Sequence, residues 1–264
     1  MQTFSFKSYG VLVQIQANSS EIIAKAETVV RTSLLDNLTL VADANFDHVF
    51  ELPMDEHGTF FLIQNGETIS YTDNEASHYK FFDSILRVAI GEYAVDCVFM
   101  HAGVVGWNGR AILLPADSFK GKSTLVTELV RCGAEYYSDE FAIIDGDGMV
   151  HPFARNINRR TENFVPYELT VEELSGRYGK QPIPVGFVLL TEFMPNGAWR
   201  PEILTAGNGV LRMIPFTLSI RYRTDFSMQV LHNVASHAII ASSPRGSAER
   251  FAKTLLDFVD NRVN

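Results

Sequence analysis

Eight consecutive residues, Ala-Asp-Ser-Phe-Lys-Gly-Lys-Ser at positions 116–123, carry the clearest chemistry in the sequence. They follow the short apolar run 111–114 and precede a stretch of helical periodicity. In a phosphate-binding P-loop, a strand leads into a tight loop whose amides meet phosphate at a helix N-terminus, where the dipole favours anions. Lys122 would then reach the outer phosphates and Ser123 would hold Mg²⁺. The segment predicts a nucleoside triphosphate site, with ATP and Mg²⁺ as its ligands.

The flanking sequence has the order that a P-loop requires. A short apolar strand is expected over 110–114, and a helix over 123–131 with its apolar residues on one face. Gly133 lies where a helix C-cap is expected. The alternative is a coincidental polar turn, because Ala116 replaces the usual first glycine and Phe119 is bulky. The residues expected to contact nucleotide are Ala116, Asp117, Ser118, Phe119, Lys120, Gly121, Lys122, Ser123 and Thr124.

Two carboxylates follow at the end of the next expected strand, 135–140. Phosphoryl transfer requires mainly positioning and charge stabilisation, so an acid near the acceptor hydroxyl and an acid near Mg²⁺ suffice beside a P-loop. We expect Asp139 to act as the general base and Glu140 to lie on the metal side. The alternative is that the pair only ends a strand in solvent or caps a turn.

These segments together resemble one kinase family. His101-Ala102-Gly103, the P-loop and Ser138-Asp139-Glu140 are similar to the catalytic domain of the HPr kinase/phosphorylase family, which is related to ATP-dependent phosphoenolpyruvate carboxykinase. The similarity is clearest from about Phe99 to Arg160. It implies a P-loop domain with a mixed β core and flanking helices, and functional positions at His101, Lys122, Ser123, Asp139 and Glu140.

The resemblance also implies a role for His101, as the side chain that orients or tunes Asp139. On composition alone, a histidine between Phe99 and Val104 is a core residue, and both readings stay open.

Arginines form a dense basic cluster after the acidic pair, at Arg155, Arg159 and Arg160. An arginine there, with Arg160 as our candidate, could neutralise charge on the transferred phosphoryl group. The alternative is a solvated loop or a surface ion pair. Trp199 could stack on adenine or pack over the core, and His151 before Pro152 is expected to be structural.

Hydrophobic patterning divides the chain into an N-terminal α+β accessory region, 1–96, and a P-loop catalytic domain, 97–264. In the first part we expect a strand from the alternation over 4–15 and a hairpin turning at Asn65-Gly66. Few helices and many hairpins favour a mixed sheet, hence an α/β fold of α+β character. The other expected elements are helices over 20–35, 74–94, 225–241 and 247–259, hairpins over 98–114 and 141–153, and a strand over 184–191.

Composition limits the partners. The net charge of -9 argues against nucleic acid and anionic membranes, which require clustered cations. No apolar run approaches the roughly 18 residues of a membrane span, and the first residues lack the pattern of an export signal, so we expect a cytoplasmic protein. Cys97 and Cys132 are expected to be buried small hydrophobic residues.

We therefore predict an ATP-dependent kinase that phosphorylates a hydroxyl, as on Ser or Thr of a protein or peptide. Two alternatives are a regulatory module that binds ATP without transfer and a small-molecule kinase. The acceptor and the oligomeric state, for which a homo-oligomer is one option, are left open by the sequence.

Overall fold

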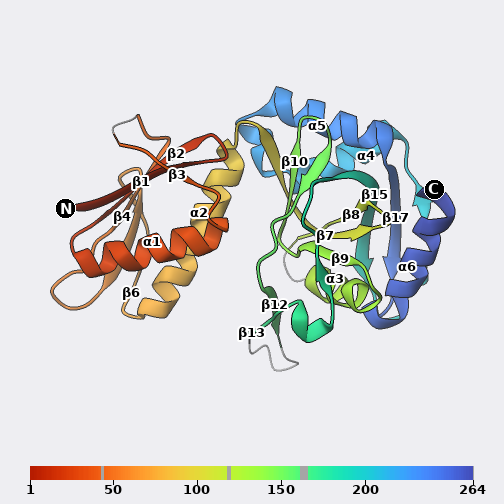
Figure 1. Cartoon of the computed structure of the whole chain (residues 1–264), viewed down its shortest axis with the longest axis horizontal. Coiled ribbons are helices and arrows are strands. Elements are labelled where there is room, and N and C mark those ends of the chain that lie inside the picture. Colours follow the sequence, from red (N-terminus) through yellow and green to blue (C-terminus); the bar gives the residue numbers. More distant parts are fainter. Residues whose placement is uncertain (43–44, 118–119, 161–165, 264) are drawn as a thin grey trace. The chain divides into compact units, whose positions relative to one another are not determined.

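The chain folds into two compact units, Met1–Asp96 and Cys97–Asn264. The computed structural model describes residues 1–42, 45–117, 120–160 and 166–263. Helices and mixed sheets occur in both units, so the protein is mixed α/β with α+β character (Figure 1). The boundary at Cys97 is the position at which the hydrophobic pattern of the sequence changes.

The first unit is built on a mixed sheet in the order β3-β1-β2-β4-β5-β6. One prediction is wrong here, because the alternation over 4–15 forms two strands. Tyr9 and Gly10 have φ of 47° and 84° and turn the chain. The two strands then pair with Ser8 opposite Val11, so the apolar alternation of the sequence continues across the turn. The strands are β1 (Gln2–Ser8), β2 (Val11–Ala17), β3 (Thr39–Leu40), β4 (His48–Leu52), β5 (Phe60–Gln64) and β6 (Glu67–Thr72).

The helices of this unit, α1 (Ser20–Leu34) and α2 (Glu75–Tyr93), pack on the sheet and on each other. The side chain of Ser19 caps α1 by accepting the amide of Ile22, and that of Asn74 caps α2 by accepting the amide of Ser77. Both predicted helices are confirmed. The hairpin of β5 and β6 is also confirmed, with its turn at Asn65-Gly66.

The second unit is built on a larger mixed sheet in the order β14-β9-β7-β10-β11-β15-β17-β16, with β8 between β7 and β15. In it β8, β15 and β17 run parallel, and β7 and β8 form the predicted antiparallel hairpin. The strands are β7 (Cys97–Trp107), β8 (Arg110–Pro115), β9 (Glu135–Ser138), β10 (Phe141–Asp145), β11 (Met149–His151), β14 (Arg177–Tyr178), β15 (Ile183–Phe193), β16 (Glu202–Ile203) and β17 (Ile239–Arg245); β12 (Ile157–Arg160) and β13 (Pro166–Leu169) pair separately.

The helices of the second unit are α3 (Lys122–Arg131), α4 (Ala206–Met213), α5 (Thr224–His237) and α6 (Ala248–Val263). The prediction of a helix over 225–241 is wrong at its end, because α5 stops at His237 and residues 239–241 belong to β17. Ile239 and Ile240 continue the apolar spacing of the helix, but they pair in parallel with Phe187 and Val188 of β15. Tertiary pairing thus overrides the helical pattern.

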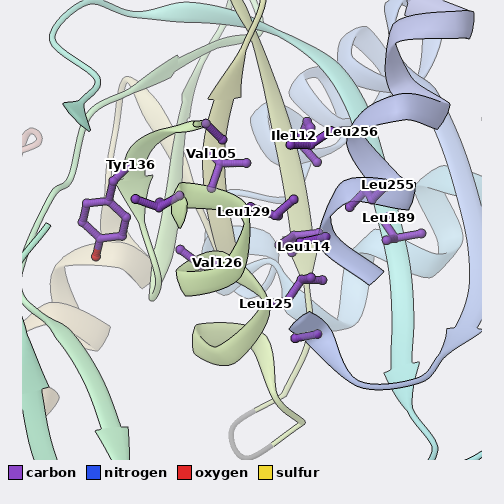
Figure 2. Close-up of a cluster of buried hydrophobic side chains, with 14 of the residues drawn as sticks. Val105, Ile112, Leu114, Leu125, Val126, Leu129, Tyr136, Leu189, Leu255 and Leu256 are labelled. Carbon is purple, nitrogen blue, oxygen red and sulfur yellow. The ribbon is translucent and has the colours of Figure 1, made fainter. Parts of the chain in front are cut away.

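Alternate residues of the strands face two separate hydrophobic layers. Ile112 and Leu114 of β8 pack with α3 and α6, as Figure 2 shows with Leu125, Leu129 and Leu255. Ala111 and Leu113 instead belong to the layer that includes residues of α4 and α5. The sheet is therefore covered on both faces, which fixes the register of β8 and the point where it delivers the chain to the next loop.

Cys97 is buried as predicted, whereas Cys132 is exposed, so the prediction for Cys132 is wrong. Cys132 is the C-cap residue directly after α3, and helix ends face solvent more readily than helix cores do. No helix in the described part of the chain is long and apolar enough to cross a membrane.

Candidate active site

The predicted P-loop lies between β8 and α3, at the edge of the sheet where parallel β8, β15 and β17 have their carboxyl ends. Such edges are common ligand sites in α/β proteins. Gly121 precedes α3 with a φ of 78°, a left-handed conformation that glycine adopts without strain. Of the predicted loop residues, Ser118 and Phe119 lie outside the described residues.

Lys122 is the first residue of α3, and it is 9% exposed. Its Nζ donates to the Ala116 carbonyl at 3.4 Å, so the side chain folds back over its own loop. Gly103 on β7 makes room, because a Cβ there would lie 3.1 Å from Lys122 Cγ. Burial lowers the pKa of Lys122 to about 8, opposed by the carboxylates of Asp139, Glu140 and Asp117.

The acidic pair lies on the turn between β9 and β10. The hydroxyl oxygen of Ser138 accepts the amides of Glu140 at 3.1 Å and Phe141 at 3.0 Å, a local arrangement that favours a tight turn. The Glu140 carbonyl accepts the amide of Ala102 at 3.1 Å. These bonds hold the turn against β7, beside the start of α3.

Asp139 is 7% exposed and contacts the P-loop. The hydroxyl of Ser123 interacts with its carboxylate, and the Tyr136 hydroxyl donates to its Oδ1 at 3.1 Å. Burial raises the pKa of Asp139, while the bonds from Ser123 and Tyr136 and the charge of Lys122 oppose the rise. The predicted acid and the predicted Mg²⁺ ligand of the loop are therefore in contact with each other.

Glu140 lies next to Arg155. Its Oε2 is 3.7 Å from Arg155 Nη1, and the two side chains are 30% and 20% exposed. The Tyr136 hydroxyl is 2.8 Å from the Arg155 carbonyl, which ties this segment to the acidic turn. From the predicted cluster the structure thus brings Arg155 to the site. Arg160 lies in β12, and its side chain is outside the described residues, so its catalytic role stays a prediction.

His101 on β7 also reaches the loop, because its carbonyl accepts the amide of Ala116 at 3.4 Å. The pKa of its imidazole is lowered to about 4, first by burial and then by the charge of Lys122, with Asp117 opposing. The ring packs against Phe141, with centroids 6.0 Å apart. His101 is therefore neutral near pH 7, and it cannot stabilise Asp139 as a cation.

A cavity of about 630 Å³ adjoins the loop, within the usual range of ligand pockets. Its walls come from the start of the P-loop, the carboxyl ends of β15 and β17, and the region of α4. Leu190, Leu211 and Phe216 supply apolar surface, and Arg212 and Thr191 supply polar groups. The arrangement suits a partly apolar ring system linked to an anion at the loop.

Two further candidates have structural contacts. Trp199 packs on Phe251 and Phe258, with ring centroids 4.9 and 5.2 Å away, which confirms packing over the core. His151 Nε2 lies 2.7 Å from Asp145 Oδ2 across the β10–β11 hairpin, as expected of a structural residue.

Lys120 lies on the rim of the cavity, and its Nζ pairs with Glu192 Oε1 at 2.9 Å. Thr124 lies in the first turn of α3. No group of three or more His, Cys, Asp or Glu side chains suited to a metal occurs among the described residues.

Two residues of the site were not anticipated from the sequence. Alternation gave no signal for Tyr136, because it lies on β9 and Asp139 on the turn that follows, and residues three apart on a strand face opposite sides. Arg245 follows an apolar stretch that reads as helix, so no pattern distinguished it. Its guanidinium donates to the Gly121 carbonyl at 2.9 Å.

Neither the models of known protein families nor the curated proteins with which the chain was compared match it.

Proposed function

We propose that this chain is an ATP-dependent kinase with an HPr-kinase-like catalytic domain, which transfers the γ-phosphoryl group to a Ser or Thr hydroxyl of a protein or peptide. The observation that carries the proposal is the contact between Asp139 and Ser123 beside the buried Lys122. A surface turn of coincidental sequence would have no reason to bury both a lysine and a carboxylate in the same loop region. A phosphate site explains both groups, since the lysine would bind phosphate and the carboxylate would hold Mg²⁺.

Ser123 and Asp139 have the chemistry to hold Mg²⁺. The ion prefers hard oxygen ligands and is commonly held by one or two protein groups together with phosphates and water. A P-loop hydroxyl and a nearby Asp are the pair used for this purpose in P-loop enzymes. Bound there, Mg²⁺ would neutralise phosphate charge. The contact with Ser123 thus favours Asp139 for the metal side, where the sequence had suggested Glu140.

Glu140 is then the better candidate for the general base. Its side chain is 30% exposed, whereas Asp139 is 7% exposed, accepts a hydrogen bond from Tyr136 and interacts with Ser123. An acceptor hydroxyl can approach the more exposed carboxylate more easily. Arg155, 3.7 Å from Glu140, could stabilise charge on the transferred group.

The nucleotide would lie across the loop. Its outer phosphates would meet Lys122 and the first amides of α3. Its nucleoside would enter the cavity lined by Leu190 and Phe216. The acceptor would approach from the side of Glu140, away from the cavity.

Incubation with γ-labelled ATP, Mg²⁺ and a set of Ser- and Thr-containing peptides and small alcohols tests the proposal. We expect label in a peptide, and loss of labelling in Lys122→Ala. ATP binding by calorimetry without transfer to any acceptor would favour the regulatory module instead. A labelled small molecule would favour a small-molecule kinase. Wild-type ATP affinity in Lys122→Ala would exclude the P-loop site.

A further inference from the structure

Arg245 is a buried cation whose guanidinium reaches the predicted P-loop from the end of β17. It ends β17 and is 2% exposed. Its Nη2 donates to the Gly121 carbonyl at 2.9 Å and its Nη1 to the Gly246 carbonyl at 3.1 Å. Its Nε is buried and has no hydrogen-bond partner among the described residues.

The charge of this guanidinium is not balanced by a carboxylate among the described residues. Its contacts there are two carbonyl groups and the ring of Phe193, whose centroid lies 5.7 Å from Cζ. Burial of the group lowers its pKa, with no acidic group opposing. Buried charges in proteins are ordinarily paired. An anion at the loop would supply the missing charge.

The bond to Gly121 has a geometric consequence for Lys122. The carbonyl of Gly121 and the amide N–H of Lys122 belong to one planar trans peptide, in which they point in opposite directions. The amide of Leu125 also donates to this carbonyl, at 3.1 Å. The Lys122 amide is one of the first helix amides, which lack partners within the helix. Holding the carbonyl inward therefore aims this amide outward, toward an anion at the N-terminus of α3.

The backbone around Arg245 is fixed closely enough to transmit this constraint. Its carbonyl accepts the amide of Met194 at 2.9 Å, and a Cβ on Gly197 would lie 2.6 Å from the same oxygen. On the loop side, a Cβ on Gly121 would lie 2.8 Å from Arg245 Nη2. Gly121 is thus required both for its positive φ and for the approach of the guanidinium.

We propose that Arg245 is a positioning residue for an oligophosphate ligand. It orients the Gly121–Lys122 peptide toward the phosphates and supplies a buried positive charge that they balance. The inference rests on the proposed nucleotide site and identifies the phosphate chain as the part of the ligand that Arg245 serves.

Calorimetric titration with inorganic pyrophosphate, with and without Mg²⁺, tests this role without relying on activity. We expect Arg245→Met to weaken pyrophosphate binding by about 10- to 100-fold, the range of a lost charge-assisted hydrogen bond. Arg245→Lys keeps the charge but has one nitrogen in place of the two that donate hydrogen bonds, so its affinity should lie between those of wild type and Arg245→Met. Arg250→Met, which removes an exposed charge on α6, is the matched control and should stay within about twofold of wild type.

Lys122→Ala separates this inference from the proposed function. Pyrophosphate binding that is lost in Lys122→Ala but retained in folded Arg245→Met overturns the role of Arg245 alone. Retained binding in Lys122→Ala overturns the nucleotide site itself. A purely structural role would lower the melting temperature of Arg245→Met and leave the affinity of the folded protein unchanged. If Arg245→Met does not fold, wild-type affinity in Arg245→Lys overturns the inference.

Discussion

Nucleotide binding is predicted to take up a proton on Lys122 in mildly alkaline solution. Burial lowers the pKa of this lysine to about 8 in the free protein. Contact with phosphates would restore the charged form and return the pKa to its ordinary range or above. The free protein therefore holds the proton weakly and the complex holds it tightly, so affinity falls as the pH rises past 8.

The magnitude follows from the pKa. At about pH 9, roughly one free molecule in ten carries the proton on Lys122, whereas at about pH 7 roughly nine in ten do. ATP affinity should thus fall about tenfold between these pH values, or ~1.4 kcal/mol. His101 does not contribute, because its pKa of about 4 leaves it neutral throughout.

Calorimetry of ATP binding with saturating Mg²⁺, at both pH values and in buffers of different ionisation enthalpy, measures the proton uptake. We expect nearly one proton per ATP at the higher pH and close to none at the lower. Lys122→Arg is the control, since arginine keeps its proton throughout this range. Equal affinity at the two pH values in wild type, or the same uptake in Lys122→Arg, would refute the reasoning.

Three further predictions follow from other contacts. Asp139→Asn should abolish the Mg²⁺ enhancement of ATP affinity measured by calorimetry, while Glu140→Gln keeps it and slows transfer by about 10²–10⁴-fold; the reverse pattern would restore Asp139 as the base. His101 has a pKa lowered from 6.5 to about 4, so the unfolded chain gains a proton first on acidification and wild-type stability falls below about pH 6.5. At about pH 4, His101→Gln should reduce this loss in the free energy of unfolding by on the order of 2–3 kcal/mol, as measured by urea unfolding. An unchanged pH dependence of stability in His101→Gln would contradict the prediction. Leu129→Ala, at a fully buried position, should lower the free energy of unfolding by ~2–5 kcal/mol, against about 0.5 kcal/mol or less for Leu40→Ala at a position that is 60% exposed; equal losses would contradict the packing of α3.

The sequence by itself determined the elements that depend on neighbouring residues. The Asn65-Gly66 and Asn108-Gly109 turns both have positive φ at their two residues, as their chemistry requires. The order of strand, loop and helix around Gly121 follows from apolar spacing and from glycine. The strand expected over 135–140 is wrong at its end, because β9 stops at Ser138, whose hydroxyl accepts the amides of Glu140 and Phe141 in the turn that follows.

Only the tertiary structure decided which of these residues meet. Residues 239–241 continue a helical pattern, yet their pairing with β15, some fifty residues earlier, makes them a strand. The choice of Asp139 over Glu140 as the partner of Ser123 is set by the packing of the β9–β10 turn against β7. The burial of Arg245 depends on that parallel pairing, which brings the end of β17 to Gly121. Local propensity acts over a few residues, whereas parallel strand pairing and the burial of charge join segments far apart in the chain, so they are visible only once the chain has folded.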